Sequence, residues 1–284
     1  MSAAVIDIGS GSVRLLLGGV KTTVMTKLGE GLNASGTLSP AAISRTVAAI
    51  KDFAQTASLA GAKIFAFATE AVRAASNRAE FINAVSEACG VRIEVVSGYE
   101  EAEMALLGAC PGGTATVVDI GGASVEIVCG DEGKVTYAKS LPLGMVRLTE
   151  QADGNAEMLR AYAATGLAKY GDVPSRGETV GVGGTFTSLA AMAQGLETYD
   201  PAAVQDFVLT REKAGELAEE LITLDTPENI GAKYPLLPKM RCELIKAGAI
   251  FVCELMDYLR ICGVRVSEAD NLDGYYRYKH LDEE

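Results

Sequence analysis

Residues 7–18 read D-I-G-S-G-S-V-R-L-L-L-G, and residues 119–130 read D-I-G-G-A-S-V-E-I-V-C-G. Each stretch follows an apolar run that predicts a strand, passes through a glycine-rich turn and enters a second apolar run. Small residues in such a turn let a phosphate approach several backbone N–H groups. The repeat therefore predicts two similar lobes that face each other across a phosphate-binding cleft.

Predicted strands and helices alternate along the whole chain, which indicates an α/β fold. The length of 284 residues, with 49% hydrophobic and 22% charged residues, suits a globular protein of two domains. The Pro-Gly-Gly sequence at residues 111–113 is the predicted boundary. We expect a first lobe at residues 1–112, a second at residues 113–269, and a last helix at about 270–284 that packs back on the first lobe.

Composition excludes several classes of function. A net charge of −12 disfavours binding to the nucleic acid backbone, and no apolar run is long enough to cross a membrane. The single histidine, His280, excludes a Ser-His-Asp triad and a His-rich zinc site, so acid–base chemistry falls to carboxylates. The chain enters a predicted strand at Val5 without a signal peptide, and its six cysteines show no C-x-x-C spacing. We therefore expect a cytoplasmic protein with reduced thiols.

Seven motifs occur in an order that resembles the exopolyphosphatase/guanosine pentaphosphate phosphatase family. They are D-I-G-S-G-S (residues 7–12), T-E-A-V-R-A-A-S-N (69–77), S-G-Y-E-E-A (97–102), D-I-G-G-A-S-V-E (119–126), S-L-P-L-G-M-V-R-L-T (140–149), G-G-T (183–185) and R-C-E-L-I-K-A-G-A (241–249). The resemblance implies two ribonuclease-H-like lobes of the actin-like ATPase and sugar kinase superfamily around a central cleft. It also implies a Mg²⁺-dependent hydrolase that releases terminal orthophosphate from inorganic polyphosphate, from guanosine pentaphosphate, or from both.

Two adjacent glutamates have different predicted roles. Ser97 and Glu100 have the spacing of a capping box, in which Glu100 turns back to the start of its helix. Glu101 matches the family's glutamate that activates water as a general base. Arg73 is the predicted side-chain ligand of phosphate, because a guanidinium fork matches phosphate oxygens. Arg73 would share one face with Thr69 and Asn77 if residues 69–77 were helical. Thr69, Asn77 and Arg241 are secondary candidates for phosphate binding.

Asp119 and Glu126 bracket the second glycine turn, where they could hold Mg²⁺ directly or through its waters. Asp7 is expected to join the same metal or to position the attacking water, and the first copy has Arg14 in place of Glu126. Three glycine turns are the predicted phosphate-binding groups. Their residues are Gly9, Ser10, Gly11 and Ser12; Gly121, Gly122, Ala123 and Ser124; and Gly183, Gly184 and Thr185.

Three positions depart from the family pattern. Gly11 replaces a usual Asn, and Glu103 and Leu272 each replace a usual Arg. Two alternatives therefore stay open: a non-catalytic regulatory protein that binds guanosine tetra- or pentaphosphate, and an ATP-dependent kinase of the same superfamily. The sequence does not rank polyphosphate against the nucleotide as substrate. A homodimer is compatible with the sequence, which does not determine the oligomeric state.

Overall fold

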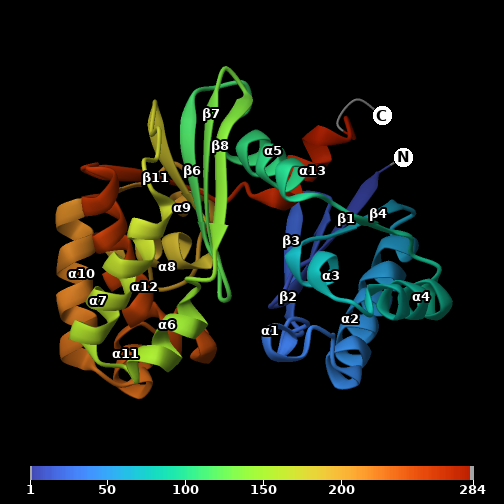
Figure 1. Cartoon of the computed structure of the whole chain (residues 1–284), viewed down its shortest axis with the longest axis horizontal. Helices are drawn as coiled ribbons and strands as arrows, with labels where there is room; N and C mark the ends of the chain where they lie inside the picture. Colours follow the sequence, from blue (N-terminus) through green and yellow to red (C-terminus); the bar gives the residue numbers. More distant parts are fainter. Residues whose placement is uncertain (1, 282–284) are drawn as a thin grey trace. The chain divides into compact units, whose positions relative to one another are not determined.

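The computed structural model describes residues 2–281, which fold as two compact α/β units (Figure 1). The first unit runs to Gly108 and resumes at Asn271, and the second is Ala109–Asp270. The first change of unit therefore comes a few residues before the Pro-Gly-Gly sequence at residues 111–113. None of the described helices combines the length and the apolar character that a membrane span requires.

The sheet of the first unit has the strand order β3-β2-β1-β4-β5. Its first three strands form an antiparallel meander, and β4 and β5 continue in parallel to β1. The strands are β1 (Ala3–Ile8), β2 (Ser12–Leu17), β3 (Val20–Met25), β4 (Lys63–Ala68) and β5 (Ile93–Val95).

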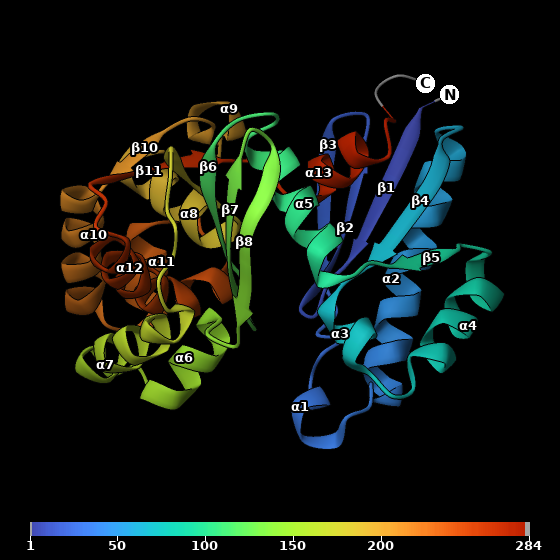
Figure 2. The same ribbon diagram turned by 45° about the horizontal axis from the view of Figure 1, so that its top comes forward.

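Both faces of this sheet are covered by helices (Figure 2). Alternate residues of β1 point to opposite faces, so Ile6 joins one hydrophobic cluster and Val5 joins the other. In the second cluster the rings of Phe67 and Tyr275 stack with centroids 4.5 Å apart. The helices of this unit are α1 (Leu32–Ser35), α2 (Pro40–Leu59), α3 (Glu70–Ala74), α4 (Arg78–Cys89), α5 (Gly98–Ala109) and α13 (Asn271–Tyr278).

The segment at residues 69–77 is not one helix, so Asn77 does not share a helical face with Arg73. Helix α3 ends at Ala74, and Ala75 is extended with φ −70° and ψ 130°. The Asn77 side chain instead bonds to the backbone of Leu38, accepting from its N–H at 2.8 Å and donating to its carbonyl at 3.0 Å. This tertiary contact lies where the chain passes from α3 to α4.

The second unit repeats the meander of the first. Strands β6, β7 and β8 are antiparallel neighbours in sequence order, and β9 pairs in parallel with β6 as β4 does with β1. The full order is β10-β11-β9-β6-β7-β8. The strands are β6 (Ala115–Ile120), β7 (Val125–Asp131), β8 (Lys134–Leu141), β9 (Glu178–Val182), β10 (Val208–Thr210) and β11 (Gly263–Ser267). The repeat in the sequence is therefore a repeat of structure.

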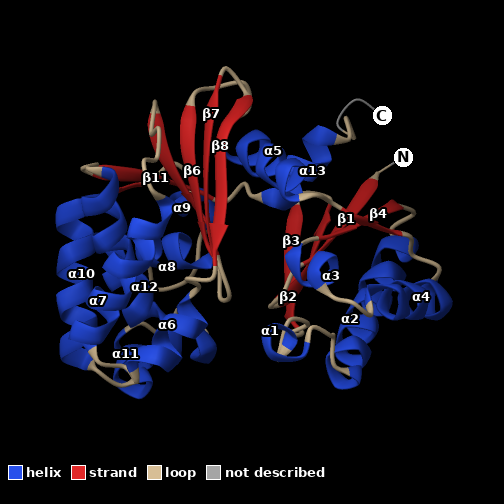
Figure 3. Ribbon diagram, viewed as in Figure 1, coloured by secondary structure: helices blue, strands red, loops and turns tan. Residues whose placement is uncertain are grey.

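The helices of the second unit group beside its sheet (Figure 3), and the long, largely buried helix α12 packs against several of the others. The sheet and these helices share one continuous hydrophobic cluster. The elements are α6 (Met145–Ala152), α7 (Ala156–Leu167), the 3-10 helix η1 (Ala168–Tyr170), α8 (Gly184–Ala193), α9 (Pro201–Val204), α10 (Arg211–Leu224), α11 (Pro227–Lys233) and α12 (Lys239–Leu259).

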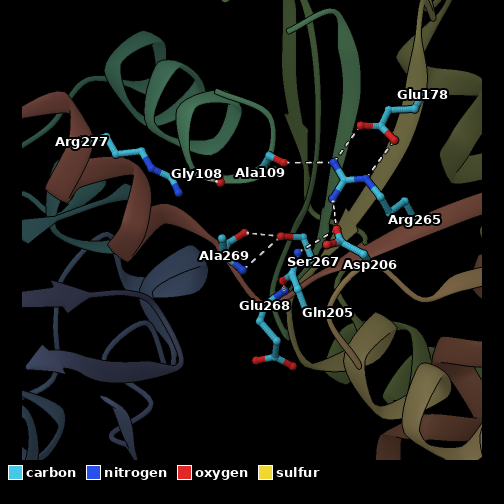
Figure 4. Close-up of polar contacts among 10 residues, drawn as sticks. All are labelled: Gly108, Ala109, Glu178, Gln205, Asp206, Arg265, Ser267, Glu268, Ala269 and Arg277. Carbon is cyan, nitrogen blue, oxygen red and sulfur yellow. Dashed lines mark hydrogen bonds and ion pairs between the residues drawn. The ribbon is translucent and has the colours of Figure 1, made fainter. Parts of the chain in front are cut away.

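Two arginines bind backbone carbonyls at the point where the chain passes from the first unit, at Gly108, to the second, at Ala109 (Figure 4). In the first unit, Arg277 Nη1 donates to the carbonyl oxygens of Leu107 and Gly108, each at 2.7 Å. In the second unit, Arg265 donates to the carbonyl oxygen of Ala109 at 3.2 Å and pairs with two acidic side chains, Glu178 and Asp206. The last carbonyls of α5, which have no partner within the helix, are satisfied in this way.

The capping box predicted at the start of α5 is present. Glu100 Oε2 accepts from the Ser97 N–H at 2.7 Å, and the Glu100 N–H donates to Ser97 Oγ at 3.2 Å. The bond from the Ser97 backbone, followed by the bond to the Ser97 side chain, lowers the pKa of Glu100 from 4.5. Glu100 is thus a structural residue that fixes the first turn of the helix carrying Glu101.

The stability that Glu100 supplies should depend on pH. Because its folded-state pKa lies below the unfolded value, the stabilisation is present above about pH 4.5 and is lost as pH falls through the folded pKa. We expect Ser97→Ala to lower the free energy of unfolding by about 1 kcal/mol. The deficit of Glu100→Gln, measured by urea denaturation, should be largest near pH 7 and shrink on acidification. A deficit that grows on acidification would contradict this assignment.

Candidate active site

The two glycine turns have the same backbone geometry. The Gly9 N–H donates to the Ser12 carbonyl at 3.0 Å, and the Gly121 N–H donates to the Ser124 carbonyl, also at 3.0 Å. In each copy the strand before the turn carries an aspartate, Asp7 or Asp119. The structure thus places the predicted residues Gly9, Ser10, Gly11 and Ser12 between the main parts of β1 and β2, and Gly121, Gly122, Ala123 and Ser124 between β6 and β7.

The first turn carries an ion pair. Asp7 lies directly opposite Arg14 in the antiparallel register, so both side chains are on one face of the sheet. Arg14 donates to Asp7 Oδ2 from Nη2 at 2.5 Å and from Nε at 3.0 Å. The aspartate is only 4% exposed. A buried carboxylate held by a guanidinium is compensated within the protein.

The second turn carries two carboxylates at the equivalent positions. Asp119 lies directly opposite Glu126, and Glu126 Oε1 accepts from Ser140 Oγ at 2.5 Å. Across the residues that the structure describes, no three His, Cys, Asp or Glu side chains gather as a metal-binding group. Two carboxylates without a third ligand do not form an all-protein cage. They fit Mg²⁺, which usually binds one or two carboxylates together with substrate phosphates and water.

A third turn joins the same unit. Strand β9 ends at Val182, and α8 begins at Gly184. Gly183 has φ 86°, and a β-carbon there would lie 2.6 Å from Asp119 Oδ1, so the glycine allows the backbone to touch that carboxylate. The Thr185 hydroxyl is buried and donates to the Ile120 carbonyl at 3.4 Å. Of the predicted Gly183, Gly184 and Thr185 set, the structure therefore brings Gly183 next to Asp119.

Arg241 lies against the start of α8. A β-carbon on Gly184 would be 2.0 Å from Arg241 Nη2. Burial lowers the pKa of the Arg241 guanidinium, and within the described part of the chain no carboxylate forms an ion pair with it. A partly buried cation beside a helix N-terminus, where backbone N–H groups also carry partial positive charge, is suited to an anion. The sequence ranked Arg241 only as a secondary candidate because burial is not visible in a motif.

The two predicted catalytic side chains of the first unit contact each other. Arg73 Nη1 donates to Glu101 Oε2 at 3.1 Å and to the Val96 carbonyl at 2.7 Å. Arg73 Nη2 donates to Glu70 at 2.5 Å. The arginine therefore links α3 to the start of α5 and orients Glu101. Its predicted role as a phosphate ligand stays a prediction.

Two residues near the second turn were missed by sequence reasoning. Ser140 binds Glu126, and Gly144 packs against the turn itself. Both belong to the quoted motif at residues 140–149, but nothing in that motif assigned a role to either residue. The departure at Leu272 also has a structural explanation, because this side chain is fully buried in the cluster between the sheet and α13.

The chain is similar over its whole length to known phosphatases. A model of the Ppx/GppA phosphatase family matches residues 4–274. Exopolyphosphatase 2 of Mycobacterium tuberculosis is 33% identical over 309 residues, which covers 95% of this chain and 96% of that protein. The crystal structure of the Aquifex aeolicus Ppx/GppA family member has 29% identity and a TM-score of 0.83, covering 100% of this chain and 98% of that one.

An exopolyphosphatase from Cytophaga hutchinsonii is 22% identical with a TM-score of 0.84, covering 100% of this chain and 98% of that one, and it shares the fold. The two-lobed α/β fold predicted from the sequence, that of the actin-like ATPase superfamily, is confirmed by these matches. Together with the geometry of the turns, the matches over most of the sequence establish that the chain belongs to the Ppx/GppA phosphatase family.

Proposed function

We propose that the protein is a Mg²⁺-dependent phosphoanhydride hydrolase that releases terminal orthophosphate from inorganic polyphosphate, from guanosine pentaphosphate, or from both. Family membership supports a phosphatase. The proposed Mg²⁺ dependence is supported by a difference between the two glycine turns. Asp7 faces Arg14, whereas Asp119 faces a second carboxylate, Glu126. A divalent cation would take at the second turn the place that a guanidinium occupies at the first.

Asp119 and Glu126 are the proposed Mg²⁺ ligands, directly or through water. The bound ion would neutralise charge on the terminal phosphoryl group. Asp7 was predicted either to join this metal or to position water. Because Arg14 already binds Asp7, we assign Asp7 the second role.

The proposed phosphate ligands are backbone N–H groups and one guanidinium. The N–H groups of residues 122–124 and of the start of α8 can each donate to phosphate oxygens. Arg241 adds a positive charge beside Gly184. In a protein with a net charge of −12, such local donors are needed to bind a polyanion.

Glu101 is the proposed general base. The oxygen of water attacks the terminal phosphorus, the bridging P–O bond breaks, and Glu101 accepts the proton of the water. A carboxylate has about four lone-pair sites, so the bond from Arg73 orients Glu101 without preventing proton transfer. Phosphoryl transfer depends mostly on such positioning and on charge neutralisation.

Glu101→Gln tests the base, and the adjacent Glu100→Gln is its matched control. Removal of a general base should lower kcat for phosphate release by about 10²–10⁴-fold. Glu100→Gln should keep kcat within a few-fold of wild type, because Glu100 serves the capping box. Steady-state phosphate release with Mg²⁺ measures both. If Glu101→Gln stays within a few-fold of wild type, the base assignment is wrong.

Glu126→Gln tests the metal site. With one carboxylate lost, the Mg²⁺ concentration that gives half-maximal activity should rise about tenfold or more, as is typical when groups at a metal site are altered. Excess chelator should abolish activity of the wild type. Glu216→Gln, on an exposed side chain of α10, is the control and should leave the Mg²⁺ dependence unchanged. An unchanged Mg²⁺ dependence in Glu126→Gln would exclude Glu126 as a ligand.

A further inference from the structure

The start of α6 bonds to the carbonyl side of the second glycine turn. The Met145 N–H donates to the Gly121 carbonyl and the Val146 N–H to the Gly122 carbonyl, each at 3.0 Å. The Gly144 N–H donates to the Ala123 carbonyl at 3.2 Å. The first N–H groups of a helix have no partner inside it. Here those donors bind the turn, so three successive turn carbonyls are fixed by one element.

These three bonds also set the direction of the turn's donors. In a trans peptide the C=O and the N–H of the same unit point in opposite directions, and the described chain has no cis peptide bond. With the carbonyls of residues 121–123 held toward α6, the N–H groups of Gly122, Ala123 and Ser124 are directed away from it. Three donors on the side opposite α6 are an arrangement that suits phosphate oxygens.

Gly144 allows this close approach. A β-carbon at Gly144 would lie 2.3 Å from the Gly122 carbonyl carbon and oxygen and from the Ala123 carbonyl carbon, all backbone atoms. The backbone of Gly144 is ordinary, with φ −63° and ψ 157°, which any residue can adopt. The position therefore requires glycine because a side chain would clash with the backbone of the second turn, and not because of backbone strain.

The first unit reaches the same result with a different sequence. The N–H groups of Thr26 and Lys27 donate to the Gly11 carbonyl at 3.0 and 2.8 Å, and the Gly29 N–H donates to the Ser10 carbonyl at 2.8 Å. These donors follow β3 as residues 144–146 follow β8, but they lie in a loop and read T-K-L-G. Two unrelated segments that brace equivalent turns indicate that the turn needs support from its carbonyl side.

We propose that Gly144 is a positioning residue, which lets the start of α6 brace the second glycine turn so that the N–H groups of residues 122–124 face the substrate phosphate. The inference rests on the proposed function, since it takes this turn as a phosphate-binding one. In Gly144→Ala the added methyl group must displace the turn from α6. The variant should bind substrate phosphate poorly even where it remains folded.

The experiment measures binding and turnover separately. Binding of a non-hydrolysable imido analogue of tripolyphosphate in the presence of Mg²⁺, followed by calorimetry well below the unfolding temperature, should weaken about tenfold in Gly144→Ala. The kcat for tripolyphosphate should fall roughly 10–100-fold because the phosphate is misplaced. Gly231→Ala in α11 is the matched control. Its β-carbon would meet only Cys242 Sγ, at 3.5 Å, and it should behave as wild type. Equal affinities of Gly144→Ala and wild type would overturn the proposal.

A second pair of variants covers a failure of Gly144→Ala to fold. Val146 is the second residue of α6 and is 39% exposed. Proline is tolerated in the first turn of a helix, so Val146→Pro removes the N–H that binds Gly122, whereas Val146→Ala keeps it. Val146→Pro should bind the same non-hydrolysable analogue roughly three- to tenfold more weakly than Val146→Ala, and equal affinities would contradict the brace. If the wild-type protein binds the analogue but releases no phosphate from tripolyphosphate, the proposed hydrolysis is wrong. The brace is not affected by that result, because it is tested by affinity.

Discussion

Asp119 and Glu126 face each other directly on neighbouring antiparallel strands, and two like charges in that position repel. In the first unit the equivalent turn has Arg14 opposite the aspartate, and the guanidinium of Arg14 binds Asp7. The second unit supplies a hydroxyl from Ser140 to Glu126. A hydroxyl donates one hydrogen bond but no positive charge. We propose that a divalent cation reduces this repulsion at the second turn, as the guanidinium of Arg14 compensates Asp7 at the first.

One short segment supports both parts of this arrangement. Residues 140–146 begin with Ser140, which binds the Glu126 carboxylate, and end with the N–H groups that bind the carbonyls of the second turn. The proposed metal ligand Glu126 and the proposed phosphate-binding turn are therefore held by the same stretch of chain. A shift of this segment would move both at once. Such mutual dependence explains why a glycine outside the turn can control what the turn binds.

The sequence predicted what depends on local pattern. The repeat and the capping box of Ser97 and Glu100 are both present, because periodicity and capping involve residues close together in the chain. Contacts between distant residues were not predictable. They include Arg73 with Glu101, Arg241 with Gly184, and Gly144 with the second turn. Arg73 and Asn77 would share a face only if residues 69–77 were one helix, and they are not, since α3 ends at Ala74 and Asn77 bonds to Leu38, a distant residue.

We infer that this site hydrolyses a terminal phosphoanhydride when Mg²⁺ is present. The most direct test is orthophosphate release by the wild-type protein from short and long polyphosphate, guanosine pentaphosphate and ATP, with and without Mg²⁺. We expect Mg²⁺-dependent release of orthophosphate from polyphosphate or guanosine pentaphosphate. Tight binding of a guanosine nucleotide with no turnover of any of these substrates would contradict it and indicate a regulatory binding protein. Formation of ADP that requires a sugar or acyl acceptor would indicate a kinase instead.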